Sequence, residues 1–90
     1  MRRSLQSVWR RIEGRQGEQF ATITGKPFTY SVTGNSLRTD RTDFTLAASD
    51  FEKALELVPI AAPGEITNVV RGSSYIWAIL HDDRIRSGEW

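Results

Sequence analysis

Apolar residues recur at helical spacing near the N-terminus of this chain. They stand at positions i, i+3, i+4 and i+7 and therefore share one face of an α-helix; they are Leu5, Val8, Trp9 and Ile12. Ser4 can cap the start of this helix, and Gly14 can take the left-handed conformation that ends one. The pattern predicts an amphipathic helix that starts after Ser4 and stops near Gly14.

Strand patterns follow between residues 19 and 46. Residues 19–24 are rich in β-branched and aromatic types, and Gly25-Lys26-Pro27 interrupts them. Apolar and polar residues alternate over residues 28–33, which indicates a strand with one buried face. Gly34-Asn35 is typical of a two-residue hairpin turn. A third strand is expected to start at Ser36 and to continue, straight or bulged, toward residue 46.

A second helix is predicted after residue 48. Ser49 and Glu52 match the capping-box pattern S-x-x-E. The apolar stripe that follows consists of Phe51, Ala54, Leu55 and Val58. Pro59 should end the helix at or before Val58, because the residue before proline avoids the helical conformation.

The last third of the chain is less clear from its pattern. Pro63 to Glu65 can open a short helix whose inward residues are Ile66, Val69 and Val70. A final helix over residues 75–81, capped by Ser73 or Ser74, would carry Ile76, Ile79 and Leu80 on its apolar stripe. The run also has strand propensity, and periodicity does not decide so short a segment. The serine cap, Ala78 and Leu80 favour the helix.

These elements predict a single α+β domain over residues 1–90. Its fold class is a three-stranded antiparallel meander with an N-terminal helix and two to three C-terminal helices packed on one face. The tail is expected to fold back over the core through Ile85 and Trp90. The predicted core consists of Leu5, Val8, Trp9, Ile12, Phe28, Tyr30, Val32, Phe51, Leu55, Val58, Ile76, Ile79 and Leu80.

Composition narrows the classes of protein that the chain can belong to. It has no cysteine, so neither a disulfide nor a thiolate metal site is available. The longest apolar run, residues 75–80, is far shorter than the roughly 20 residues of a membrane-spanning helix. The N-terminal arginines are not followed by the apolar stretch of a signal peptide, so we expect a cytoplasmic protein with no membrane partner.

Charge is spread unevenly although the net charge is only +1. Residues 1–15 hold five arginines and one glutamate, a net of +4. Residues 47–70 hold one lysine and four acids, a net of −3, and the remaining segments balance. Such a bipolar distribution suits a partner that binds in one orientation.

Catalytic and metal-binding patterns are weak. His81 is the single histidine, and its neighbours Asp82 and Asp83 would not face it on a helix. The sequence has no G-x-S-x-G nucleophile motif and no zinc, calcium or phosphate-loop spacing. We therefore expect no enzyme activity, no catalytic residues, no metal and no small-molecule cofactor.

Nucleic-acid binding is the leading functional hypothesis. Arginines on the polar face of the first helix could neutralise phosphates, and further arginines follow the hairpin and precede the last helix. The candidate DNA- or RNA-binding residues are Arg3, Arg10, Arg11, Arg38, Arg41 and Arg71. The alternative interpretation of these residues is a solubilising surface.

Residues 65–80 (EITNVVRGSSYIWAIL) resemble a helix-turn-helix. The resemblance implies that the second helix would enter the major groove with Tyr75, Trp77 and His81 facing the bases. Three residues depart from the pattern: Ile66 stands where a small residue is usual, Val70 where the turn usually begins with glycine, and Arg71 where an apolar residue packs. The element order is also similar to the double-stranded-RNA-binding domain, but acidic residues at the second helix replace that family's lysine cluster.

The rival hypothesis is a protein-interaction or homodimerisation domain. Tyr75 and Trp77 would act as interface anchors, since exposed aromatic residues beside arginine commonly do so. The edge of the meander could also accept a strand from a protein partner or from a second copy of the chain.

Overall fold

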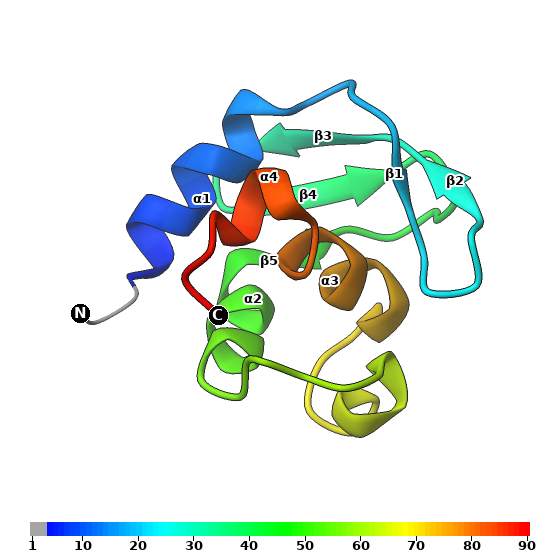
Figure 1. Cartoon of the computed structure of the whole chain (residues 1–90). Coiled ribbons are helices and arrows are strands. Elements are labelled where there is room, and N and C mark those ends of the chain that lie inside the picture. Colours follow the sequence, from blue (N-terminus) through cyan, green and yellow to red (C-terminus); the bar gives the residue numbers. More distant parts are fainter. Residues whose placement is uncertain (1–3) are drawn as a thin grey trace.

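The computed structural model describes residues 4–90, which form an α+β fold with two small antiparallel sheets and a helical C-terminal half (Figure 1). The elements in chain order are α1 (Leu5–Gly14), β1 (Phe20–Ala21), β2 (Pro27–Phe28), β3 (Tyr30–Thr33), β4 (Ser36–Thr39), β5 (Leu46–Ala47), α2 (Ala48–Leu55), the 3-10 helix η1 (Pro63–Ile66), α3 (Ser73–Leu80) and α4 (Asp83–Arg86). The predicted fold class, a three-stranded antiparallel meander with helices, is confirmed.

The strands of that meander differ from the predicted set. β3, β4 and β5 form it, whereas β1 pairs only with β2, in a separate two-stranded sheet. The predicted strand over residues 28–33 is divided at Thr29, whose N–H donates to Asp40 Oδ1 and whose carbonyl accepts the Asp40 N–H. These contacts bind Thr29 to the loop after β4, so β2 and β3 enter different sheets.

The predicted hairpin turn at Gly34-Asn35 is confirmed, because Thr33 and Ser36 are cross-strand partners on either side of it. Gly34 alone takes a positive φ, 59°, and Asn35 does not. A glycine in the first central position suits a turn of this kind. The Gly34 carbonyl also accepts a hydrogen bond from Trp9 Nε1 at 3.1 Å, which ties the turn to α1.

α1 follows its prediction closely. The Ser4 side chain caps it by accepting the Ser7 N–H at 3.1 Å, and Val8, Trp9 and Ile12 are buried. The expected left-handed Gly14 is wrong, because the helix ends through Arg15 and the first positive-φ glycine is Gly17.

α2 begins one residue before the predicted capping box. Its N-cap is Ala47, with no side-chain hydrogen bond, so the box formed by Ser49 and Glu52 is wrong. β5 leads directly into the helix, and the Ala48 N–H donates to the Asn35 carbonyl at 2.7 Å. A tertiary contact therefore satisfies a donor at the start of α2.

The helical alternative for residues 73–80 is confirmed as α3. Its N-cap is Gly72 rather than either serine, and Gly72 has φ 72°. This φ favours glycine, and a Cβ at this position would also lie 2.4 Å from Leu46 Cδ2, so that the Leu46 side chain would have to move. Of the predicted inward residues before α3, Ile66 and Val70 are buried, but Val69 is 41% exposed.

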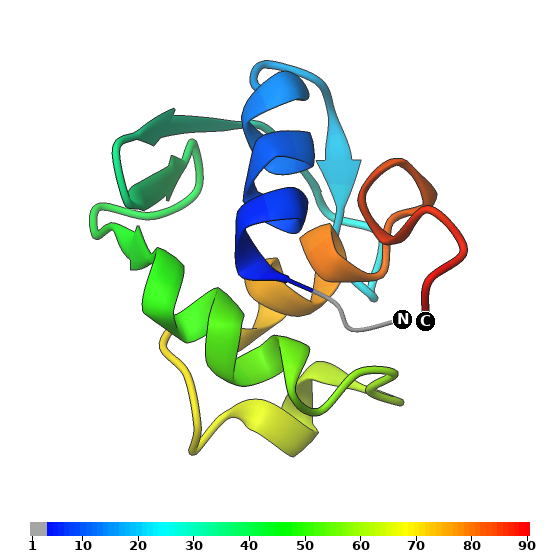
Figure 2. The same cartoon turned by 90° about the vertical axis from the view of Figure 1, so that its left-hand side faces the viewer.

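The core is continuous across the two sheets and the helices. Figure 2 shows α1 standing between the β3–β4 hairpin on one side and β1 with α4 on the other. The structure adds Phe20, Leu37, Leu46, Ile60 and Ile85 to the predicted core. Two predicted core residues, Leu5 and Val32, are only partly buried. None of the helices in residues 4–90 is long and apolar enough to cross a membrane.

Candidate nucleic-acid interface

The candidate arginines lie in two regions of the molecule. Arg10 and Arg11 are on α1, whereas Arg38 and Arg41 belong to β4 and the loop that follows it. Figure 1 places α1 on the left, whereas the loop between β4 and β5 extends to the right, behind the β1–β2 hairpin. Arg71 joins the second region, because its guanidinium carbon lies 4.2 Å from the centroid of the Phe44 ring. Arg3 lies outside the described residues.

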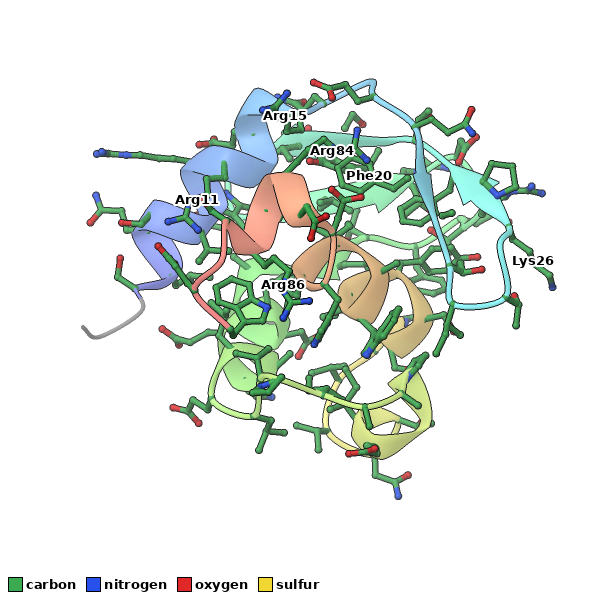
Figure 3. All side chains as sticks on the ribbon, viewed as in Figure 1. Arg11, Arg15, Phe20, Lys26, Arg84 and Arg86 are labelled. Atoms are coloured by element: carbon green, nitrogen blue, oxygen red, sulfur yellow. The ribbon has the colours of Figure 1, made fainter. Side chains whose placement is uncertain are left out.

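Arg84, on α4, is paired with acids of the same chain. Arg84 donates through Nε and Nη2 to the two oxygens of Asp82, at 2.8 and 2.9 Å, and through Nη1 to Glu18 at 3.1 Å. Its guanidinium also bonds the Gln19 carbonyl and lies 3.9 Å from the centroid of the Phe20 ring. Figure 3 shows Arg84 extended over Phe20. Arg84 thus joins α4 to β1.

The electrostatic consequences of this contact extend to its neighbours. The hydrogen bond from Arg84 lowers the pKa of the Asp82 carboxyl below its usual value. The bonds to Asp82 and Glu18 raise the pKa of Arg84 itself. Burial raises the pKa of Tyr30, whose hydroxyl donates to the Ile12 carbonyl at 2.5 Å.

Arg11 makes a second contact of the same kind. It donates to both oxygens of Glu89, at 3.1 and 2.5 Å, and to the Ile85 carbonyl at 2.9 Å. Arg11 was a candidate for nucleic-acid binding, yet its charge is already paired within the chain. We call Arg11, Arg84 and their acidic partners Asp82, Glu18 and Glu89 the C-terminal clamp.

The second group of cations includes two arginines that contact neutral groups and not carboxylates. We call it the loop cluster; its members are Lys26, Arg38, Arg41 and Arg71. Arg41 Nε donates to the Pro27 carbonyl at 3.0 Å, and Arg71 stacks on Phe44. Lys26 directly precedes Pro27 and points away from the body of the molecule (Figure 3). Arg38 has an acidic contact, Asp43, at 4.0 Å.

Threonine side chains fix the backbone of the loop that carries this cluster. Thr39 is 2% exposed, and its hydroxyl accepts the Arg41 N–H at 3.2 Å. The same hydroxyl lies 3.2 Å from that of Thr42, which donates to the Phe44 carbonyl. Arg41 and Phe44 are therefore held by a short network that starts from a buried side chain.

Phe44 is not among the residues that the sequence suggests for the site. Lys26 is suggested by its turn, Gly25-Lys26-Pro27, on the same predicted hairpin ribbon as Arg38 and Arg41, although it is not among the candidate binding residues given above. With Asp40 and Asp43 counted, the four cations and two acids of this region leave a net charge of +2. This surface is positive without being uniformly basic.

Arg10 lies apart from the loop cluster, in a shallow groove of about 360 Å³ between α1, the Gly34-Asn35 turn and the start of α2. Leu5, Trp9 and Glu13 line the same groove. Arg10 therefore has an acidic neighbour, Glu13, and lies on α1, away from the segment that carries the loop cluster.

The residues of the rival hypothesis are occupied by internal contacts. Trp77 is half-buried and donates from Nε1 to the Ile60 carbonyl at 2.7 Å, and Tyr75 packs edge-on against Phe28. At the free edge of β3, the Tyr30 carbonyl accepts the Gly17 N–H and the Val32 N–H donates to Gln16 Oε1. That edge offers little to an added strand.

His81 is engaged by backbone groups rather than by acids. Nδ1 faces the Trp77 carbonyl at 2.9 Å, and Nε2 accepts the Ile60 N–H at 3.0 Å. Both ring nitrogens are thus used, and no triad of the Ser-His-Asp type includes this imidazole. Among the residues that the structure describes, no group of three or more metal-ligating side chains exists.

Comparison of the chain with protein-family models, with curated proteins and with solved structures gave no match. Residues 63–72, where the helix-turn-helix resemblance requires a first helix, form a 3-10 helix and turns. Its three groove-facing candidates, Tyr75, Trp77 and His81, are all partly buried. The arrangement of the cations is therefore the feature of the molecule that points to a function.

Proposed function

We propose that the protein is a small, non-enzymatic module that binds the phosphate backbone of double-stranded nucleic acid through the loop cluster. The supporting observation is that Arg41 and Arg71 are positioned by a carbonyl and an aromatic ring, not by carboxylates. Their charge remains available to a partner, in contrast to that of Arg11 and Arg84.

Side chains that are positioned by neutral atoms favour phosphate binding because they keep free N–H donors and are already ordered. Within residues 4–90 the Arg41 guanidinium uses only Nε in a hydrogen bond, which leaves Nη1 and Nη2 for a phosphate. The Arg71 guanidinium lies over the Phe44 ring and makes no hydrogen bond to another residue of 4–90, so its N–H groups remain for a phosphate. Side chains that are already oriented lose less conformational entropy on binding.

A duplex fits this surface better than a single strand. Proteins that bind single strands stack the bases on exposed aromatic side chains. No aromatic residue in the described part of the chain is exposed, and Phe44 is covered by Arg71. Binding should therefore depend on phosphates and be almost independent of base sequence.

The test is a salt titration of binding to DNA and RNA duplexes of random sequence. If two to four phosphates are contacted, the slope of log K against log salt should be roughly −2 to −4. The double variant Arg41→Gln/Arg71→Gln should flatten this slope by about 2 and weaken binding about tenfold at low salt.

A matched control removes the same charge elsewhere. Arg15→Gln/Lys53→Gln neutralises two exposed cations that already have acidic neighbours, Glu18 and Asp50. It should change affinity by less than about threefold. Equal loss in both double variants, or no binding of the unmodified protein to either duplex at low salt, would overturn the proposal.

The rival proposal is association through Tyr75 and Trp77, either with a protein partner or between copies of the chain. It predicts a mass that rises with protein concentration in analytical ultracentrifugation. A mass that stays at the monomer value over the whole concentration range would contradict self-association.

A further inference from the structure

The side chains of Trp77 and His81 hold one peptide unit from both sides. Trp77 Nε1 donates to the Ile60 carbonyl at 2.7 Å, and the Ile60 N–H donates to His81 Nε2 at 3.0 Å. The two rings stack, with centroids 4.8 Å apart and an angle of 11° between their planes. A carbonyl only accepts, so the contact between Nδ1 and the Trp77 carbonyl places the imidazole proton on Nδ1.

The held segment, residues 56–62, connects α2 to η1 without regular structure. It nevertheless buries two apolar side chains, Val58 and Ile60, which are 7% and 4% exposed. At its ends Leu57 and Ala62 bond to neighbouring backbone, but its centre is attached to α3 through Trp77 and His81.

We propose that His81 is a pH-sensitive latch for residues 56–62. Nε2 accepts the Ile60 N–H only while it carries no proton. When Nε2 is protonated, two N–H groups face each other, the contact is lost, and the segment moves away from α3. Val58 and Ile60 then become accessible and add to Leu57, which is already 49% exposed.

The groups around the His81 imidazole favour its neutral form in the folded protein. Burial lowers the pKa of His81 from its usual value, the bond to the Trp77 carbonyl raises it in part, and the charge of Arg86 on α4 lowers it. The Arg86 guanidinium is itself bonded to the Trp90 oxygen. α3 contributes no charged side chain. The adjacent Asp82 is bound to Arg84, Asp83 is exposed on α4, and the segment itself carries only the exposed Glu56.

The direction of the pH effect follows from this pKa. The pKa of His81 is lower in the folded protein than in the unfolded chain. Between these two values His81 is mostly protonated in the unfolded chain and mostly neutral in the folded protein, so the unfolded chain binds more protons. The latch is therefore fully formed above about pH 6.5, the ordinary histidine value, and weakens as the pH falls below it.

Hydrogen exchange of the Ile60 amide, followed by NMR together with the His81 ring shifts, tests the latch. The protection factor, corrected for the intrinsic pH dependence of exchange, should fall at least tenfold as His81 becomes protonated. The buried helical amide of Ile12 should keep its protection over the same range. An Ile60 protection factor that stays constant while His81 titrates would overturn the proposal, as would a parallel loss at Ile60 and Ile12.

A variant links the effect to the imidazole. His81→Gln cannot titrate, so the Ile60 protection factor should be independent of pH in this variant, whatever its level. A His81→Gln variant that kept the pH profile of the unmodified protein would contradict the latch. The titration of the unmodified protein stands by itself if the variant folds poorly.

Discussion

Arginine has opposite uses in the C-terminal clamp and in the loop cluster. Arg84 reaches Glu18 across 66 positions of the chain, and Arg11 reaches Glu89 across 78, so both join distant segments through opposite charges. Arg41 and Arg71 instead rest on a carbonyl and a ring. An arginine therefore indicates a binding function only where no carboxylate of the same chain pairs with its guanidinium.

The largest effect should come from removing Arg84. Arg84→Ala deletes four hydrogen bonds and the contact with Phe20, and it leaves Asp82 without its cation. Hydrogen bonds to charged groups, discounted for a side chain that is partly exposed, suggest a loss of about 2 kcal/mol in unfolding free energy. Urea denaturation measures it. Arg41→Ala should cost less than about 0.5 kcal/mol, and equal costs would contradict the distinction between the two regions.

The next largest effect concerns the pH dependence of the stability that the C-terminal clamp contributes. The pKa of Asp82 is lowered in the folded protein, so its contribution to stability is present above the unfolded value near pH 4 and is lost as the pH falls through the folded pKa. Asp82→Asn should therefore make the decline of unfolding free energy between about pH 5 and pH 2 less steep. Asp43→Asn, at an exposed site, is the control and should retain the full decline. Identical pH profiles in the two variants would count against the role of Asp82.

The smallest effect concerns the ring beneath Arg71. Phe44→Leu keeps an apolar side chain but removes the surface on which the guanidinium stacks, so duplex affinity should fall about two- to threefold, in line with an exposed cation–π contact. Fluorescence anisotropy with a labelled duplex measures this loss. Phe44→Tyr retains a ring and should bind like the unmodified protein. If both variants lost affinity equally, the ring would not be what orients Arg71.

Local signals predicted the helices better than the sheets. α1 has its cap, its apolar stripe and its end within ten or so residues, and it was placed almost correctly. α2 was placed correctly as a helix, but its start depends on Asn35, whose carbonyl accepts the Ala48 N–H. The division of the predicted strand at Thr29 likewise depends on Asp40, eleven positions away, and no local pattern reveals it.

The candidate site shows the same limit. Three candidates that the sequence suggests lie in or contact the segment between β4 and β5: Arg38, Arg41 and Arg71. The sequence also suggests Arg11 as a candidate, because its pattern reveals the polar face of the first helix. The pattern does not reveal the glutamate that pairs with Arg11. Long-range charge pairing decides which arginines are free, and a single sequence does not contain it.

Arg41 and Arg71 are proposed to bind a partner and to contribute little to the stability of the fold. Urea unfolding of the unmodified protein and of Arg41→Gln/Arg71→Gln, each with and without duplex, tests both halves together. Without duplex the two unfolding free energies should agree within about 1 kcal/mol. A duplex at 10 to 100 times the dissociation constant of the unmodified protein should stabilise that protein by about 1.4 to 2.7 kcal/mol, and should stabilise the variant, which binds about tenfold more weakly, by only about 0.4 to 1.4 kcal/mol. A variant that is as strongly stabilised by duplex as the unmodified protein would contradict the claim.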